Sequence, residues 1–87
     1  MENQKITLTV NGQDLHFEVE LDSYNKYLND LTPSNKIAPA KNFIMRSVTS
    51  ESKEGARAII ELPSGALQLA GALVDKYTPD IEIVVGK

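Results

Sequence analysis

Apolar and polar residues alternate along residues 5–21, in two runs on either side of Asn11-Gly12. Such alternation is typical of a half-buried β-strand. Asn-Gly is a strong signal for a two-residue hairpin turn, because a type I′ turn needs positive φ at both central residues. With these two residues as the loop, Leu8 faces Leu15, and the apolar faces of the two strands coincide. The pattern therefore predicts an N-terminal β-hairpin in this register.

After the hairpin the apolar spacing changes from two residues to three or four, which is typical of helices. Asp22 is a candidate N-cap of a first helix, which must end before Pro33, because the residue ahead of a proline disfavours the α conformation. A loop over 32–38 follows. Pro39 suits the first turn of a second helix, where a missing N–H costs nothing, and this helix is expected to run to about Thr49.

Two further helices and a strand complete the predicted chain. A break at 50–52 precedes a short third helix that runs through Leu62, and a fourth helix covers about 64–77. The fourth helix is apolar nearly all round, so it lies at the centre of a core or is covered by a partner. Residues 81–85 alternate again and could add a strand to the hairpin's sheet. The sequence thus predicts an α+β fold in a single domain over 1–87.

Size, charge and cysteine content narrow the function class. A chain of 87 residues buries only about 60–65% of its unfolded surface, so docking against another subunit would stabilise it. A net charge of −3 disfavours nucleic acid as a partner, since a basic stripe would be expected for a phosphate backbone. The absence of cysteine excludes disulfides and thiolate chemistry. No signal peptide and no apolar run of about 20 residues is visible, so we expect a cytoplasmic protein without membrane contact.

Candidate catalytic and metal-binding residues lack the partners that their chemistry needs. His16 is the only histidine, and neither a nucleophile nor a second imidazole accompanies it, so we interpret it as a solvated strand residue. Glu18, Glu20 and Asp22 could be a divalent-cation cluster, but no loop dense in oxygen ligands follows, and a solvated acidic edge is the better interpretation. The glycines match neither a phosphate loop nor a dinucleotide fingerprint. We therefore predict no enzyme, no metal and no cofactor.

Three features could instead serve a protein partner. The loop over 33–42 is stiffened by two prolines and is either a shaped connection between helices or a recognition loop. Small residues around Gly65 and Gly71 give the fourth helix faces suited to close packing, in the core or against a partner or second copy. Arg46 is a single charge on an otherwise apolar helix, and it could pair with a carboxylate of the hairpin or first helix, or reach water.

Short strings spread over nearly the whole chain carry a family resemblance: Leu8 to Gly12, Tyr24 to Tyr27, Pro33, Asn35 to Ala40, Asn42-Phe43, Arg46, Glu61 to Pro63, the apolar helix and Pro79 to Ile83. Together they resemble the small phage tail assembly chaperones encoded by tailed phages and bacterial prophages. The resemblance implies a non-enzymatic protein that keeps the long, largely helical tape-measure protein soluble during tail assembly and is absent from the finished virion. A spare apolar helix face suits that task, since a tape measure exposes apolar helical stripes before assembly.

Under this hypothesis, the stiffened loop–helix region 33–46 and the apolar fourth helix are the expected contact surface for the tape measure or another tail protein. The candidate partner-binding residues are Asn35, Lys36, Phe43, Arg46, Leu67, Ala70 and Val74. One alternative is a minor structural component of the tail that is retained in the virion and associates with copies of itself through its sheet edge. A weaker alternative is a small regulator from a mobile element that mimics the negative charge of nucleic acid. A net charge of −3 over 87 residues is too small to favour such mimicry.

Overall fold

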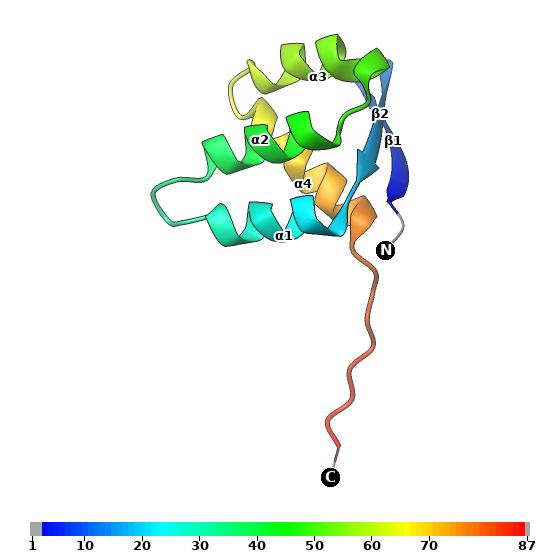
Figure 1. Cartoon of the computed structure of the whole chain (residues 1–87), viewed down its shortest axis with the longest axis vertical. Helices are drawn as coiled ribbons and strands as arrows, with labels where there is room; N and C mark the ends of the chain where they lie inside the picture. Colours follow the sequence, from blue (N-terminus) through cyan, green and yellow to red (C-terminus); the bar gives the residue numbers. More distant parts are fainter. Residues whose placement is uncertain (1–2, 87) are drawn as a thin grey trace.

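An antiparallel β-hairpin leads into four α-helices within residues 3–86, the part of the chain that the computed structural model describes (Figure 1). The predicted α+β fold is therefore confirmed. The elements in order are β1 (Gln4–Val10), β2 (Gln13–Val19), α1 (Leu21–Asp30), α2 (Ile37–Ser47), a 3₁₀ turn η1 (Ser50–Ser52), α3 (Lys53–Ile60) and α4 (Gly65–Tyr77).

The hairpin has the register that the sequence predicts. Leu8 lies opposite Leu15, and Ile6 lies opposite Phe17. At the turn, Asn11 adopts φ 51° and Gly12 adopts φ 81°, the positive values that a type I′ turn requires. The apolar side chains of both strands are buried against the helices, while the alternate residues face outward.

The outer edge of β2 is covered by the chain that leaves α2. Phe17 and Val48 form an antiparallel bridge, and the Thr49 N–H donates to the His16 carbonyl oxygen at 3.0 Å. The His16 N–H donates to Ser52 Oγ at 2.9 Å. These bonds satisfy both backbone groups of His16 on the side away from β1. This short third pairing ends α2 at Ser47, two residues before the predicted end, because Val48 is extended.

The core lies between the hairpin and the helices, and α4 is at its centre. α4 packs against α2, α3 and β1 and runs behind α2 in Figure 1. Its inward residues Leu69, Ala70 and Leu73 are buried. The rings of Tyr27 and Phe43 are stacked at 4.8 Å and an interplanar angle of 9°, joining α1 to α2. One face of the apolar fourth helix therefore lies in the core, while Leu67, Gly71 and Ala72 on its other side are exposed.

Two helix starts differ from the sequence prediction. Glu20 is the N-cap of α1 and makes no side-chain capping bond, while Asp22 lies in the first turn. A carboxylate there still interacts favourably with the helix dipole. α2 begins at Ile37, two residues earlier than expected, which leaves Pro39 within the first turn, where its missing N–H is tolerated.

The C-terminal segment does not form the strand that the alternation at 81–85 allowed. Residues 79–86 have no regular secondary structure and lead away from the body of the molecule (Figure 1). A strand needs a neighbouring chain to satisfy its backbone groups, and the described residues place none beside this segment. Thr78 is extended and Pro79 has a fixed φ, so the chain continues outward from α4.

Candidate partner-binding groove

Three large apolar side chains that are exposed to solvent line one groove. Ile37, Leu62 and Leu67 are 56%, 50% and 39% exposed, respectively. They come from the start of α2, the turn between α3 and α4, and the first turn of α4, and Lys41 and Pro63 line the same groove. Its volume is about 270 Å³. The groove therefore combines the loop–helix region and the fourth helix, the two parts of the chain proposed from sequence to contact a partner.

The turn between α3 and α4 positions Leu62 at this groove. Ser64 has φ 64°, and the Gly65 N–H donates to the Leu62 carbonyl oxygen at 2.8 Å. A side chain at position 65 would collide with the carbonyl oxygen of Ile59, so glycine is needed where α4 passes α3. This tight connection brings the N-terminus of α4 beside the C-terminus of α3 and leaves Leu62 on the surface.

The groove has an apolar floor and a rim that carries charge. Ile60 and Ala66 are buried and form part of the floor, while Lys41 and Glu61 lie at the sides. Such a surface can accept apolar side chains spaced three and four residues apart on a partner helix. The ammonium group of Lys41 can pair with a carboxylate beside that stripe. The arrangement is suited to binding a protein segment.

Among the residues proposed from sequence, Leu67 lines the groove, and Asn35 and Lys36 precede the groove residue Ile37 in the chain. Asn35 and Thr32 exchange backbone hydrogen bonds of 3.2 Å, which shape the exposed loop before α2. Lys36 is the N-cap of α2 and directly precedes Ile37. These contacts place the loop next to the groove, with Leu67 on the α4 side.

Phe43 and Ala70 do not belong to an accessible surface. Both are completely buried, Phe43 because its ring stacks on Tyr27 and Ala70 because it faces the centre of the core. Apolar character on a helix gives no information on which residues face a partner and which face the core. The structure therefore corrects the proposed contact set by removing these two residues.

Arg46 and Val74 lie on α2 and α4 outside the groove. The Arg46 guanidinium donates to the backbone carbonyl oxygen of Ser23 at 3.4 Å, so its partner in α1 is a carbonyl group instead of a carboxylate. Val74 is half-buried against the core. Sequence reasoning missed Ile37, Lys41 and Leu62 as groove residues. The available signal was a large apolar residue directly beside a loop, at Ile37 after Lys36 and at Leu62 before Pro63.

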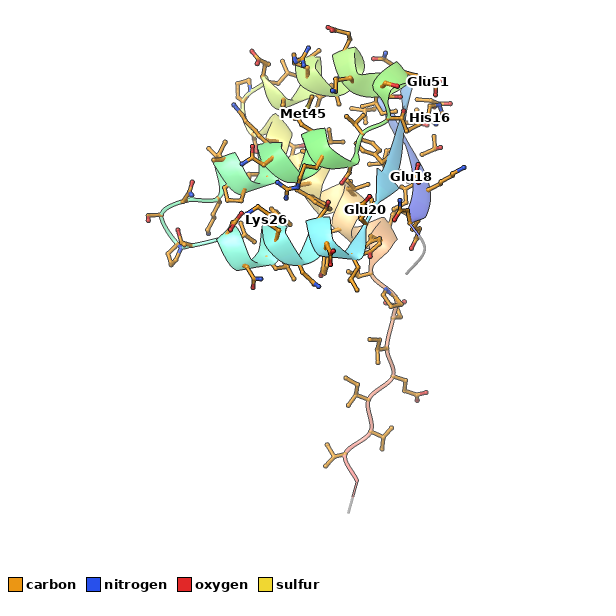
Figure 2. The ribbon with its side chains drawn as sticks, in the orientation of Figure 1. His16, Glu18, Glu20, Lys26, Met45 and Glu51 are labelled. Atoms are coloured by element: carbon orange, nitrogen blue, oxygen red, sulfur yellow. The ribbon has the colours of Figure 1, made fainter. Side chains whose placement is uncertain are left out.

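Several outward polar side chains of the hairpin hydrogen-bond to a neighbouring polar side chain. Figure 2 shows His16, Glu18 and Glu20 spaced along β2 and its end. His16 Nδ1 lies 3.0 Å from Thr7 Oγ1, and the Asn3 side-chain amide donates to Glu18 at 3.0 Å. Within residues 3–86 no group of three or more His, Cys, Asp or Glu could hold a metal ion.

None of the helices in residues 3–86 has the length and apolarity to cross a membrane.

A family model described as phage tail assembly chaperone matches residues 6–87. The chain is 36% identical over 80 residues to a protein of Haemophilus phage HP1 (strain HP1c1), described as an uncharacterised 11.3 kDa protein in the lys 3′ region. That match covers 92% of this chain and 78% of the relative. No solved structure matches significantly. The chain belongs to the phage tail assembly chaperone family.

Proposed function

We propose that this protein keeps the tape-measure protein of its phage soluble during tail assembly, as a binding protein without catalytic turnover in the cytoplasm of the bacterial host. Family membership supports a role in phage tail assembly. The observation that carries the proposed mode of action is the groove at Ile37, Leu62 and Leu67, which presents apolar side chains on the surface. A helical tape measure has apolar stripes that such a groove can cover until assembly.

The groove favours a reversible contact. Covering the exposed parts of three side chains contributes about 1 kcal/mol each, a total that is small beside the cost of association. A chaperone has to release its client when the tail tube polymerises, so a weak contact repeated along a long helical client fits the task better than one tight contact. Lys41 and Glu61 line the groove, so they can pair with an acidic and a basic residue that flank the apolar stripe of the client.

Co-expression with the tape-measure protein of the same phage tests the proposal. We expect the soluble fraction of the tape measure to increase when this chain is present and to fall again with Leu67→Asp, because a carboxylate would be desolvated in the groove. Leu28→Asp is the matched control, since Leu28 is 45% exposed on α1 and does not line the groove. A tape measure that is equally insoluble with and without this chain would refute the proposal.

Purified virions provide a second check. A chaperone leaves before the particle is complete, so mass spectrometry of virions should not detect this chain at a stoichiometric copy number. Stoichiometric retention would instead support the alternative, a minor structural component of the tail.

A further inference from the structure

We propose that residues 80–86 of one copy pair as a β-strand with the outer edge of β1 in a second copy, so that two chains exchange their C-terminal segments. Two features of the chain support this proposal. The outer edge of β1 is unpaired and lies beside a groove, and residues 80–86 form an unpaired segment of matching length that favours the extended conformation. The proposal concerns self-association; the groove beside β1 shares Leu62 and Pro63 with the groove proposed for the client, so the tests are made without tape-measure protein.

The outer edge of β1 has free backbone groups. The N–H and carbonyl of His16 bond to Ser52 and Thr49, so they point away from β1. In an antiparallel pair, the groups of the residue opposite then point away from β2, and that residue is Thr7. Lys5, two residues away, has the same orientation. Within residues 3–86 no backbone hydrogen bond reaches this side of Thr7. The edge can therefore accept a further strand.

The C-terminal segment has the composition and length of such a strand. Ile81, Ile83 and Val85 alternate along it and are 71%, 80% and 92% exposed. Branched apolar residues favour the extended conformation and leave the segment with apolar surface to bury. Residues 80–86 match the seven residues of β1 in length. The segment contains no helix or strand of its own.

A groove beside β1 can receive the apolar face of the added strand. It is lined by Thr9 and Val10 of β1 and by Gln68 and Ala72 of α4, with a volume of about 340 Å³. A strand paired with β1 places alternate side chains on the core face of the sheet. Ala72 is small, so it leaves space next to that face for an isoleucine or valine side chain.

Lys5 offers one charge contact to the added strand, beside Glu18, which already lies opposite it on β2. Lys5 is the only charged residue of β1, and its side chain lies on the outward face of the hairpin. Asp80 and Glu82 alternate with the apolar residues of the segment, so they share the outward face of the added strand. Opposite charges on neighbouring strands stabilise a sheet modestly and help to select the partner.

Local geometry favours the edge of a second copy over the edge of the same chain. The Gln4 side chain donates to the Lys76 carbonyl oxygen at 3.4 Å, so α4 ends beside the start of β1. To follow its own β1, the chain would have to reverse within the residues that follow Tyr77. Thr78 is extended, Pro79 has a fixed φ, and no glycine lies between Tyr77 and Gly86 to supply the left-handed conformation common in helix-to-strand reversals. Reciprocal exchange closes a two-fold dimer, because each edge receives one segment.

Sedimentation of the full-length chain over a wide concentration range tests the proposal, with no tape-measure protein present. We expect a monomer–dimer equilibrium whose dissociation constant rises by at least about tenfold with Ile83→Lys, which places a charge on the buried face of the added strand. Val84→Lys is the matched control, since Val84 is 79% exposed and lies on the opposite face of the strand. It should leave the dissociation constant nearly unchanged.

A second pair of variants tests the edge. Thr7→Pro removes the outward N–H and should likewise raise the dissociation constant, whereas Thr7→Val removes the hydroxyl but keeps that N–H and should leave the constant nearly unchanged. Circular dichroism checks that Thr7→Pro is folded. If it is unfolded, Ile83→Lys still tests the proposal, because that substitution leaves β1 unaltered. Mixing the Ile83→Lys and Thr7→Pro chains should restore a weaker association, because one intact segment then meets one intact edge.

Three results would overturn the proposal. The first is a monomer at every concentration, and the second is a dimer that neither Ile83→Lys nor Thr7→Pro weakens. The third is protection of the amides at 81–85 from hydrogen exchange at concentrations where the chain is monomeric, which would show that the segment folds back on its own chain.

Discussion

β1 and the segment over 81–85 both carry apolar residues at every second position, yet they differ completely in burial. Ile6 and Leu8 of β1 lie in the core, while Ile81 and Ile83 are exposed. β1 is followed by a turn that returns the chain alongside it, whereas the C-terminal segment follows a helix and an extended Thr78-Pro79 connection. Alternation therefore defines the face that a strand can bury, and a neighbouring strand decides whether it is buried.

The two edges of the hairpin show the same difference. The edge of β2 is covered by Val48, Thr49 and Ser52, residues that lie about thirty positions further along the chain. The edge of β1 has no such neighbour within residues 3–86. Substitutions can alter the covered parts of the hairpin and the exposed C-terminal segment separately.

The largest expected effect comes from truncating a buried apolar residue of the hairpin. Leu15 is completely buried, so Leu15→Ala should lower the free energy of unfolding by about 2–5 kcal/mol, through lost burial and the cavity that remains. Ile83→Ala, measured at a concentration where the chain is monomeric, should change it by less than about 0.5 kcal/mol. Urea denaturation followed by circular dichroism measures both. Equal losses would show that the C-terminal segment packs on the domain in solution.

The turn residue Gly12 should give the next largest effect. Its φ of 81° favours glycine, so Gly12→Ala should cost about 1–2 kcal/mol of stability, although nothing lies within 4 Å of the added methyl group. Gly86→Ala is the control, because position 86 also has open space and no such backbone conformation. Thermal unfolding of both variants measures the difference. An unchanged midpoint for Gly12→Ala would contradict the type I′ turn.

The hairpin could be predicted residue by residue because its determinants are local. The Asn11-Gly12 turn and the two flanking runs together define one register, and the structure has that register. The helices were also predicted, since their apolar spacing and prolines are local signals, and their ends moved by about two residues. The contact of Val48 with Phe17 could not be predicted, because it depends on where α2 delivers the chain relative to β2.

The groove could be predicted only in part. Leu67 lines the groove, whereas Asn35 and Lys36 do not line it, and Phe43 and Ala70 are core residues. On a helix that is apolar nearly all round, the exposed side is set by the positions of neighbouring helices. The tight turn that brings Leu62 beside Leu67 is likewise a tertiary feature.

The covered edge of β2 should give a smaller but measurable effect. Ser52 Oγ accepts the His16 N–H at 2.9 Å, so Ser52→Ala should cost about 1 kcal/mol, the net value of one such hydrogen bond. Ser50→Ala in the same 3₁₀ turn should have little effect, because Ser50 is exposed. Hydrogen exchange should show faster exchange of the His16 amide in Ser52→Ala alone. Unaltered exchange there would contradict the proposed protection of this edge.

The smallest expected effect is a pH dependence of the free energy of unfolding that arises in the folded body of the molecule and not in the C-terminal segment. Burial raises the pKa of Tyr27 above the ordinary tyrosine value of about 10, whereas residues 79–86 contain no tyrosine. The folded state therefore binds the phenolic proton more tightly than the unfolded state. This contribution is fully present below the unfolded pKa and is lost as the pH rises through the folded pKa.

The free energy of unfolding should accordingly fall above about pH 10, and Tyr27→Phe should remove part of that fall, because phenylalanine has no proton to lose. Denaturation midpoints measured across the alkaline range provide the comparison, with Ile83→Ala as the control from the exposed segment. Ile83→Ala should keep the pH profile of the unaltered chain. If Tyr27→Phe keeps it as well, the alkaline loss of stability arises from another group, and the stacked pair of Tyr27 and Phe43 does not contribute to it.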